Sequence, residues 1–217
     1  MSADANGAPR SRAIDRFEVF ATFLLALATV ATAWSSYQAT RWNGEQAKAV
    51  SRANALRIES TKSADLANAQ TEVDVIVFTQ WLDAFARQET ALADFYSARF
   101  RAEFKPAFEA WLDAQPLQNP DAPQTPFATD EYVVAAKVEA DRLAAEAETF
   151  AARARENIQR ASNYVLCVVL FAAALFFAGA SARFQARGPR LAVLFIGSAL
   201  FIGAVIWIST FPISVDV

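Results

Sequence analysis

Several residue types on which most enzymes depend are scarce or missing in this sequence. It has no histidine and a single cysteine, Cys167. This excludes disulfide frameworks, Cys/His zinc sites, histidine-ligated haem and catalytic schemes built on an imidazole base. Only 6 glycines and 8 prolines occur among 217 residues, too few for the frequent turns of a β-sandwich or barrel. We therefore predict an all-α fold with no catalytic residues, no cofactor and no metal site.

Sequence motifs with a chemical mechanism are also missing. The chain has no glycine-rich phosphate loop and no Gly-x-Ser-x-Gly nucleophile elbow. The nearest approach to a carboxylate pair is Glu72 with Asp74, but residues two apart on a helix do not face each other. Both carboxylates are therefore predicted to be solvated, and the chain is predicted not to be an enzyme.

Long uncharged runs are the most prominent feature that is present. Hydrophobic residues make up 54% of the chain and charged residues 20%. A bilayer core of about 30 Å needs about 20 helical residues, and we predict transmembrane helices over 19–37, 161–182 and 191–211. Aromatic residues typical of the headgroup level lie near one end of each run: Trp34 and Tyr37, Tyr164, and Trp207.

The distribution of basic residues predicts the orientation, because short segments rich in Lys and Arg stay cytoplasmic. The N-terminal tail 1–18 and the loop 183–190 carry three arginines each and are predicted to be cytoplasmic. The C-terminal tail 212–217 has no basic residue and is predicted to lie on the opposite side. Cleavage after the Ala31-Thr32-Ala33 sequence, as in a signal peptide, is an alternative to an anchor.

Residues 38–160 are predicted to form a helical domain outside the membrane. This region holds 14 basic and 19 acidic residues, a net charge of −5, and no nucleic-acid partner is predicted. Glu45 to Lys105 contains neither glycine nor proline, which predicts one or two long helices in a coiled-coil-like hairpin or bundle. Asp130 is predicted to cap a shorter return helix. The longer outgoing arm then either bends back near 62–71 or extends beyond its partner.

An aromatic stripe near the far end of this domain is the first candidate site. Four prolines in 115–129 predict an extended tip, and Pro106 is predicted to open a short helix before it. The candidate interaction stripe consists of Phe78, Trp81, Phe85, Phe95, Tyr96, Phe100, Phe104, Phe108 and Trp111. The residues predicted to cover it are Phe127, Tyr132, Val133, Val134, Val138 and Leu143. The stripe is either a buried helix face or, if incompletely covered, a patch for another subunit or an apolar ligand.

A small, partly hydroxylated face of the first span is the second candidate site. This candidate seam consists of Asp15, Glu18, Thr22, Ala26, Thr29, Ala33 and Ser36. Small faces let helix backbones approach closely, so the three spans pack on one another through such faces within one chain. Alternatively, the first span lines a pore in a homo-oligomer, with acidic side chains at the cytoplasmic mouth. The spans contain no Asp, Glu, Lys or Arg in their interiors, which argues against active transport.

Two short stretches carry a family resemblance. They are Ala33-Trp34-Ser35-Ser36-Tyr37-Gln38-Ala39, followed by Trp42, and Phe78-Thr79-Gln80-Trp81. Together with the layout of one span, a long helical excursion and two closing spans, the chain resembles bacterial three-span membrane proteins filed as domains of unknown function. The resemblance implies a bacterial inner membrane, in which the arginine distribution predicts a cytoplasmic N-terminus and an extracytoplasmic C-terminus. It implies no activity, ligand or catalytic residue.

These observations predict a non-enzymatic integral membrane protein. Its partners are expected to be the lipid bilayer and either further copies of itself or another membrane protein, bound through the outward helical domain. Two alternatives stay open: a homo-oligomeric passive ion channel lined by the first span, and an extracytoplasmic sensor that needs a separate signalling partner.

Overall fold

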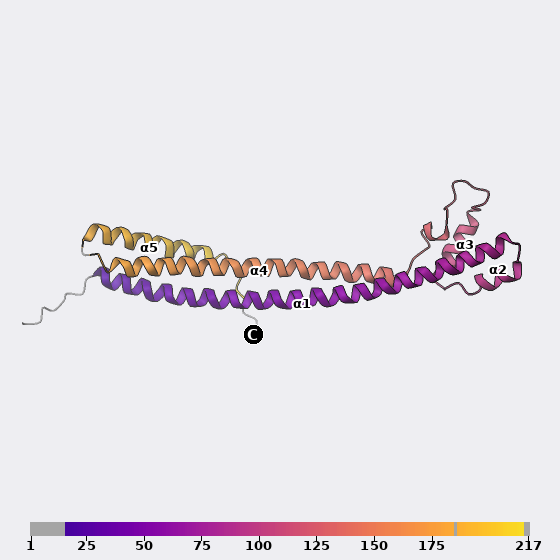
Figure 1. Cartoon of the computed structure of the whole chain (residues 1–217). Coiled ribbons are helices and arrows are strands. Elements are labelled where there is room, and N and C mark those ends of the chain that lie inside the picture. Colours follow the sequence, from indigo (N-terminus) through magenta and orange to yellow (C-terminus); the bar gives the residue numbers. More distant parts are fainter. Residues whose placement is uncertain (1–15, 185, 215–217) are drawn as a thin grey trace, which may run out of the picture. The chain divides into compact units, whose positions relative to one another are not determined.

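The structure, a computed structural model, describes residues 16–184 and 186–214. The predicted all-α fold is confirmed, because these residues form helices and no strand. The elements in chain order are α1 (Arg16–Ala86), α2 (Thr90–Ser97), α3 (Lys105–Asp113), the short 3-10 helix η1 (Pro126–Ala128), α4 (Ala135–Ser181) and α5 (Arg187–Ile208) (Figure 1). The helices α1, α4 and α5 are each long and apolar enough to cross a membrane.

Helix α1 runs without a break for 71 residues, so the bend considered near 62–71 does not occur. It ends in a Schellman motif, in which Gln88 adopts a left-handed conformation with φ 61°. The Glu89 backbone N–H donates to the Ala84 carbonyl at 3.0 Å and the Gln88 N–H to the Phe85 carbonyl at 3.0 Å. The expectation of long helices up to Lys105 is therefore wrong: the chain turns after Ala86 and continues as the 8-residue α2.

The chain divides into two compact units, Met1–Lys48 with Arg153–Val217 (unit 1) and Ala49–Ala152 (unit 2). In unit 1, the first part of α1, the second part of α4 and α5 pack together, with α5 lying along α4 (Figure 1). Their shared cluster contains Leu24 from α1, Ala178 from α4 and Leu194 from α5. At Gly197 of α5, a Cβ would lie 3.1 Å from the Phe177 Cβ, so this close approach of α5 to α4 depends on glycine.

Buried polar groups tie the segment after α5 back onto the helices of unit 1. The Gln38 side-chain amide donates to the Ser214 carbonyl at 3.4 Å, and the Ser214 backbone N–H donates to Gln38 Oε1 at 3.1 Å. The Tyr164 hydroxyl donates to the Pro212 carbonyl at 3.1 Å. Because most buried polar groups in folded proteins have a hydrogen-bond partner, these contacts help to fix where the chain runs after Ile208.

In unit 2, the later part of α1 packs against the first part of α4 and then meets the short helices. Leu56 of α1 packs with Leu143 and Ala147 of α4. The return helix begins at Ala135 rather than at Asp130, so that predicted cap is wrong. The residues before α4 form turns, including a bond from the Tyr132 N–H to the Thr129 carbonyl at 3.2 Å.

The segment between the arms agrees better with the sequence-based expectation. Helix α3 has proline in its first turn, which confirms the short helix predicted from Pro106. The proline-rich segment 115–129, predicted to be an extended tip, consists instead of turns and the short η1. It is anchored where the Trp111 indole N–H donates to the Pro123 carbonyl at 2.8 Å.

Candidate functional site

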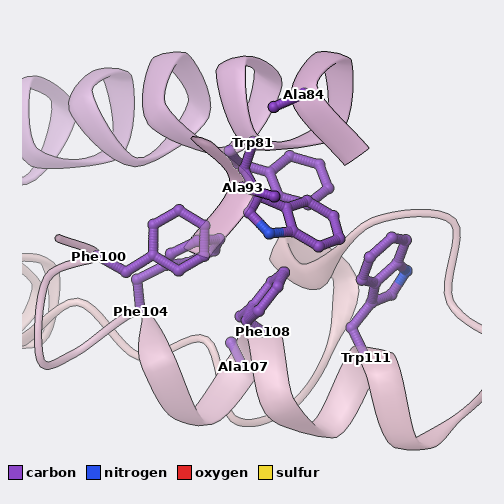
Figure 2. Packing of buried hydrophobic residues seen from close by; sticks show 9 residues of the cluster. Trp81, Ala84, Ala93, Phe100, Phe104, Ala107, Phe108 and Trp111 are labelled. Carbon is purple, nitrogen blue, oxygen red and sulfur yellow. The ribbon is translucent and has the colours of Figure 1, made fainter. Parts of the chain in front are cut away.

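The aromatic residues of unit 2 form one packed cluster where the end of α1 meets α2, α3 and η1. Phe78 lies at its centre. Its ring centroid is 5.4 Å from that of Trp111 and 5.7 Å from that of Phe127, both with the edge-to-face geometry that aromatic pairs favour. Figure 2 shows Trp81 and Phe108 pointing toward each other from opposite helices, and their centroids are 4.7 Å apart.

The structure separates the candidate interaction stripe into a buried and an exposed part. The buried members are Phe78, Trp81, Phe100, Phe104, Phe108 and Trp111. Tyr96 is half-buried against them. Phe85 and Phe95 are 47% and 48% exposed. Most of the stripe is therefore a core, and only its two exposed rings are available to a ligand or partner.

The cover over this core differs from the predicted one. Phe127 and Tyr132 pack against the cluster as expected. Val133 and Val138, in contrast, are exposed, and Leu143 belongs to a separate cluster with Leu56. The chain turn after α1 supplies the missing cover, because it lets α3 and the loop before it fold their aromatic residues back onto α1 (Figure 2).

A buried carboxylate lies next to the aromatic cluster. The Asp74 side chain is 1% exposed, with Oδ1 3.6 Å from Arg101 Nε. The Tyr132 hydroxyl donates to Asp74 Oδ2 at 3.2 Å and also lies 3.2 Å from the Thr71 hydroxyl. Burial raises the pKa of Asp74, while the Arg101 charge and the Tyr132 hydroxyl act to lower it. Burial likewise raises the pKa of Tyr132.

The prediction that Asp74 is solvated is therefore wrong, whereas Glu72 is exposed as expected. A sequence signal for this was present: Asp74 is four residues before Phe78, so both lie on the same face of α1. Arg101 is also paired with Glu103. The arrangement joins α1, the loop before α3 and the turn before α4, which is a structural role.

The candidate seam in unit 1 lies on the face of α1 that points away from α4 and α5. Its described members, Glu18, Thr22, Ala26, Thr29, Ala33 and Ser36, are all exposed, and Asp15 lies outside the described residues. The intrachain packing expected of this seam is instead made by Ala21, Leu24, Ala28, Ser35 and Gln38. The hydroxyls of Thr22 and Thr29 donate to the carbonyls of Glu18 and Leu25 in their own helix, each at 2.8 Å. This side of α1 therefore has no partner within the described part of the chain.

No group of His, Cys, Asp and Glu side chains within 16–184 and 186–214 is arranged to hold a metal ion. Comparison with known proteins gave no match to a family model, to a curated protein or to a solved structure. The architectural resemblance described above accordingly stays a prediction, and the functional argument rests on the surfaces of the chain itself.

Proposed function

We propose that the protein is a non-enzymatic integral membrane protein whose helical domain, unit 2, mediates self-association through α1. The observation that carries this proposal is that α1 has two apolar faces in unit 2. One is buried against α4 and the aromatic cluster, through residues such as Leu56 and Phe78. The other is exposed and consists of Leu66, Ala69, Val73 and Ile76, with Ile58 further toward the N-terminus beyond Lys62.

This exposed α1 face has the spacing of a helix–helix interface. From Leu66 to Ile76 its residues recur at intervals of three, four and three, the pattern of the a and d positions of a coiled coil. A solvated helix needs one apolar stripe and keeps its opposite face polar. A second stripe exposing Ile58, Leu66, Val73 and Ile76 by half or more is therefore best explained by a second helix.

A second copy of the chain is the partner that the proposal names. Copies anchored in one membrane by α1, α4 and α5 have the same orientation, so their α1 helices run parallel. In a parallel pair the same residues meet across the contact, and Val73 then faces Val73 of the other copy. The location in a bacterial inner membrane belongs to the same proposal and rests on the architectural resemblance, and the placement of unit 2 outside the cytoplasm rests on the arginine distribution.

Disulfide cross-linking of the full chain in liposomes tests this interface. In a Cys167→Ser background, Val73→Cys places a thiol on the exposed α1 face, and mild oxidation is expected to give a covalent dimer. Val75→Cys is the matched control, since Val75 is 42% exposed against 50% for Val73 but lies on another side of α1. Equal cross-linking of the two variants, or a mass of 23.7 kDa alone in native mass spectrometry, would refute the proposal.

The exposed seam in unit 1 favours one further candidate function, a homo-oligomeric passive channel. Thr22, Thr29 and Ser36 face away from α4 and α5, where they are available to line a path between copies. If they do so, Thr29→Leu abolishes ion flux in liposomes while Val30→Leu, on the neighbouring side of α1, does not. Equal flux in both variants would exclude this role.

A further inference from the structure

An open groove of about 610 Å³ lies beside the aromatic cluster of unit 2, between the end of α1, α2 and α3. Its apolar wall includes Trp81, Phe85 and Leu112, and its polar groups include Gln88, Thr90 and Asp94. A cavity of this size matches those that hold small organic ligands, which are mostly apolar with a few placed polar groups. Self-association through the exposed α1 face does not involve these residues.

Phe85 presents an aromatic face to this groove. Its ring stacks on Trp81, with centroids 5.1 Å apart and an interplanar angle of 18°. Trp81 is buried, whereas Phe85 is 47% exposed. Because stacking covers one face of the Phe85 ring, the exposed surface belongs largely to the other face. Such a face carries the negative part of the ring quadrupole and attracts organic cations.

The charge of the residues that line the groove also favours a positively charged ligand. Asp94 is the one ionisable residue among those lining it, and no Lys or Arg is among them. Its carboxylate makes no hydrogen bond and no ion pair with any residue that the structure describes. An aromatic wall with an unpaired carboxylate is complementary to a ligand that is both apolar and positively charged, and it disfavours anions.

A ring outside the groove already holds a cation from the chain. The Arg99 guanidinium lies 3.4 Å from the centroid of Phe95, the other exposed ring of the stripe. Phe95 is thus already occupied by a cation from the chain. Phe85 is exposed to the same extent and lines the groove instead, and no cation from the described residues lies over its ring.

We propose that this groove is a binding site for a small organic cation, an amine or quaternary ammonium group attached to an apolar body. The apolar body packs against Phe85, Trp81 and Leu112, and the positive charge lies between the Phe85 ring and the Asp94 carboxylate. Gln88 and Thr90 supply hydrogen-bonding groups at the rim. Such a ligand site in unit 2 would be the ligand-binding part of the sensor considered as an alternative function.

Saturation-transfer NMR on the full chain in lipid nanodiscs tests the site, with benzyltrimethylammonium as the cation, benzyl alcohol as the neutral ligand and benzoate as the anion. Empty nanodiscs provide the blank. Benzyltrimethylammonium is expected to bind with a dissociation constant of about 1 mM or below for a ligand of this size, and clearly more tightly than the other two. Equal binding of all three ligands, or no binding of the cation, would overturn the proposal.

Two pairs of variants separate this site from general surface effects. Asp94→Asn is expected to weaken binding of the cation about fivefold and to leave benzyl alcohol unchanged. Glu109→Gln removes the same charge from α3 outside the groove and is expected to have no effect. Phe85→Leu is expected to weaken cation binding about threefold, while Phe95→Leu does not. Losses that are equal within each pair would refute the assignment even if one variant were poorly folded.

Discussion

Units 1 and 2 differ in the proportion of large and small side chains that they bury, although Tyr164 and Phe171 are buried in unit 1 as well. In unit 1 the buried positions are mostly small, such as Ala28, Ala174 and Ala178, while Phe176 and Phe195 are among the most exposed residues. In unit 2 the large rings of Trp81, Phe104 and others are buried. Burial of large apolar groups is driven by water, whereas in lipid, close approach of small residues decides how helices pack. The difference is the one expected of the proposed arrangement, in which lipid surrounds unit 1 and water surrounds unit 2.

The two units also differ in the charge of the polar groups that they bury. Unit 1 buries the neutral amide of Gln38, which is satisfied by two hydrogen bonds to Ser214. Unit 2 buries the carboxylate of Asp74, which is compensated by Arg101 and by Tyr132. A buried charge is costly unless it is paired and hydrogen-bonded, and surrounding lipid increases that cost. None of the described residues of unit 1 that are buried as a whole is charged, which agrees with the proposed position of this unit in a membrane.

The largest expected effect comes from replacing a large buried ring of unit 2 by a small side chain. Phe104 is 0% exposed, and the centroid of its ring is 5.1 Å from that of Phe127. Phe104→Ala is expected to cost unit 2 about 3–5 kcal/mol, measured as faster hydrogen–deuterium exchange of its amides. Phe195→Ala, at a site in unit 1 that is 74% exposed, is expected to stay within about 0.5 kcal/mol. Equal losses for both variants would remove the contrast between the units.

A smaller effect is expected from enlarging a contact residue in unit 1. At Gly197 a Cβ would lie 3.3 Å from the Ala174 carbonyl oxygen, whereas at Gly203 of the same helix nothing lies within 4 Å. Gly197→Leu is expected to destabilise the packing of α4 and α5 by about 1–3 kcal/mol. The readout is the thermal unfolding midpoint in nanodiscs. Gly203→Leu should leave that midpoint nearly unchanged, and a comparable drop there would contradict the proposed importance of small residues.

The sequence predicted the helical class and the three long apolar helices, because these follow from composition and from uncharged runs. It did not predict the end of α1. Left-handed residues at helix ends are usually glycine, and Gln88 adopts that conformation instead. The rings of α3 and of the loop before it pack on α1 only through that turn, so the cover of the aromatic cluster depended on a break that composition does not reveal.

Both candidate sites were affected by the same limit of periodicity. A helical spacing identifies which residues share a face, but it does not say whether that face is turned inward. The seam of Thr22, Ala26 and Thr29 is such a face, and it is exposed, whereas Ala21, Leu24 and Ala28 make the intrachain contact. Asp74 shares a face with Phe78, and there the face is buried. Which face packs depends on the partner helices, which lie far away in the sequence.

The smallest expected effect concerns pH and sharpens the contrast between a charged and a neutral interior. Burial raises the pKa of Asp74 above its ordinary value of 3.8, although Arg101 and Tyr132 act to lower it and Glu103 adds to the increase. The folded state therefore binds a proton more tightly than the unfolded state. The stability that this proton contributes is present below pH 3.8 and is lost as the pH rises through the raised pKa.

Asp74→Asn removes this titration. The free energy of unfolding of unit 2 in the natural chain, minus that of Asp74→Asn, is therefore expected to fall as the pH rises from about 4. Hydrogen exchange of unit 2 amides at several pH values, corrected for the intrinsic exchange rate, measures that difference. Glu72→Gln is the matched control, because Glu72 is exposed two residues away. The corresponding difference in unfolding free energy for Glu72→Gln is expected not to change with pH. Amides of unit 1, whose buried Gln38 does not titrate, should show no change between the natural chain and Asp74→Asn; a pH-dependent change there would mean that the two units do not respond separately.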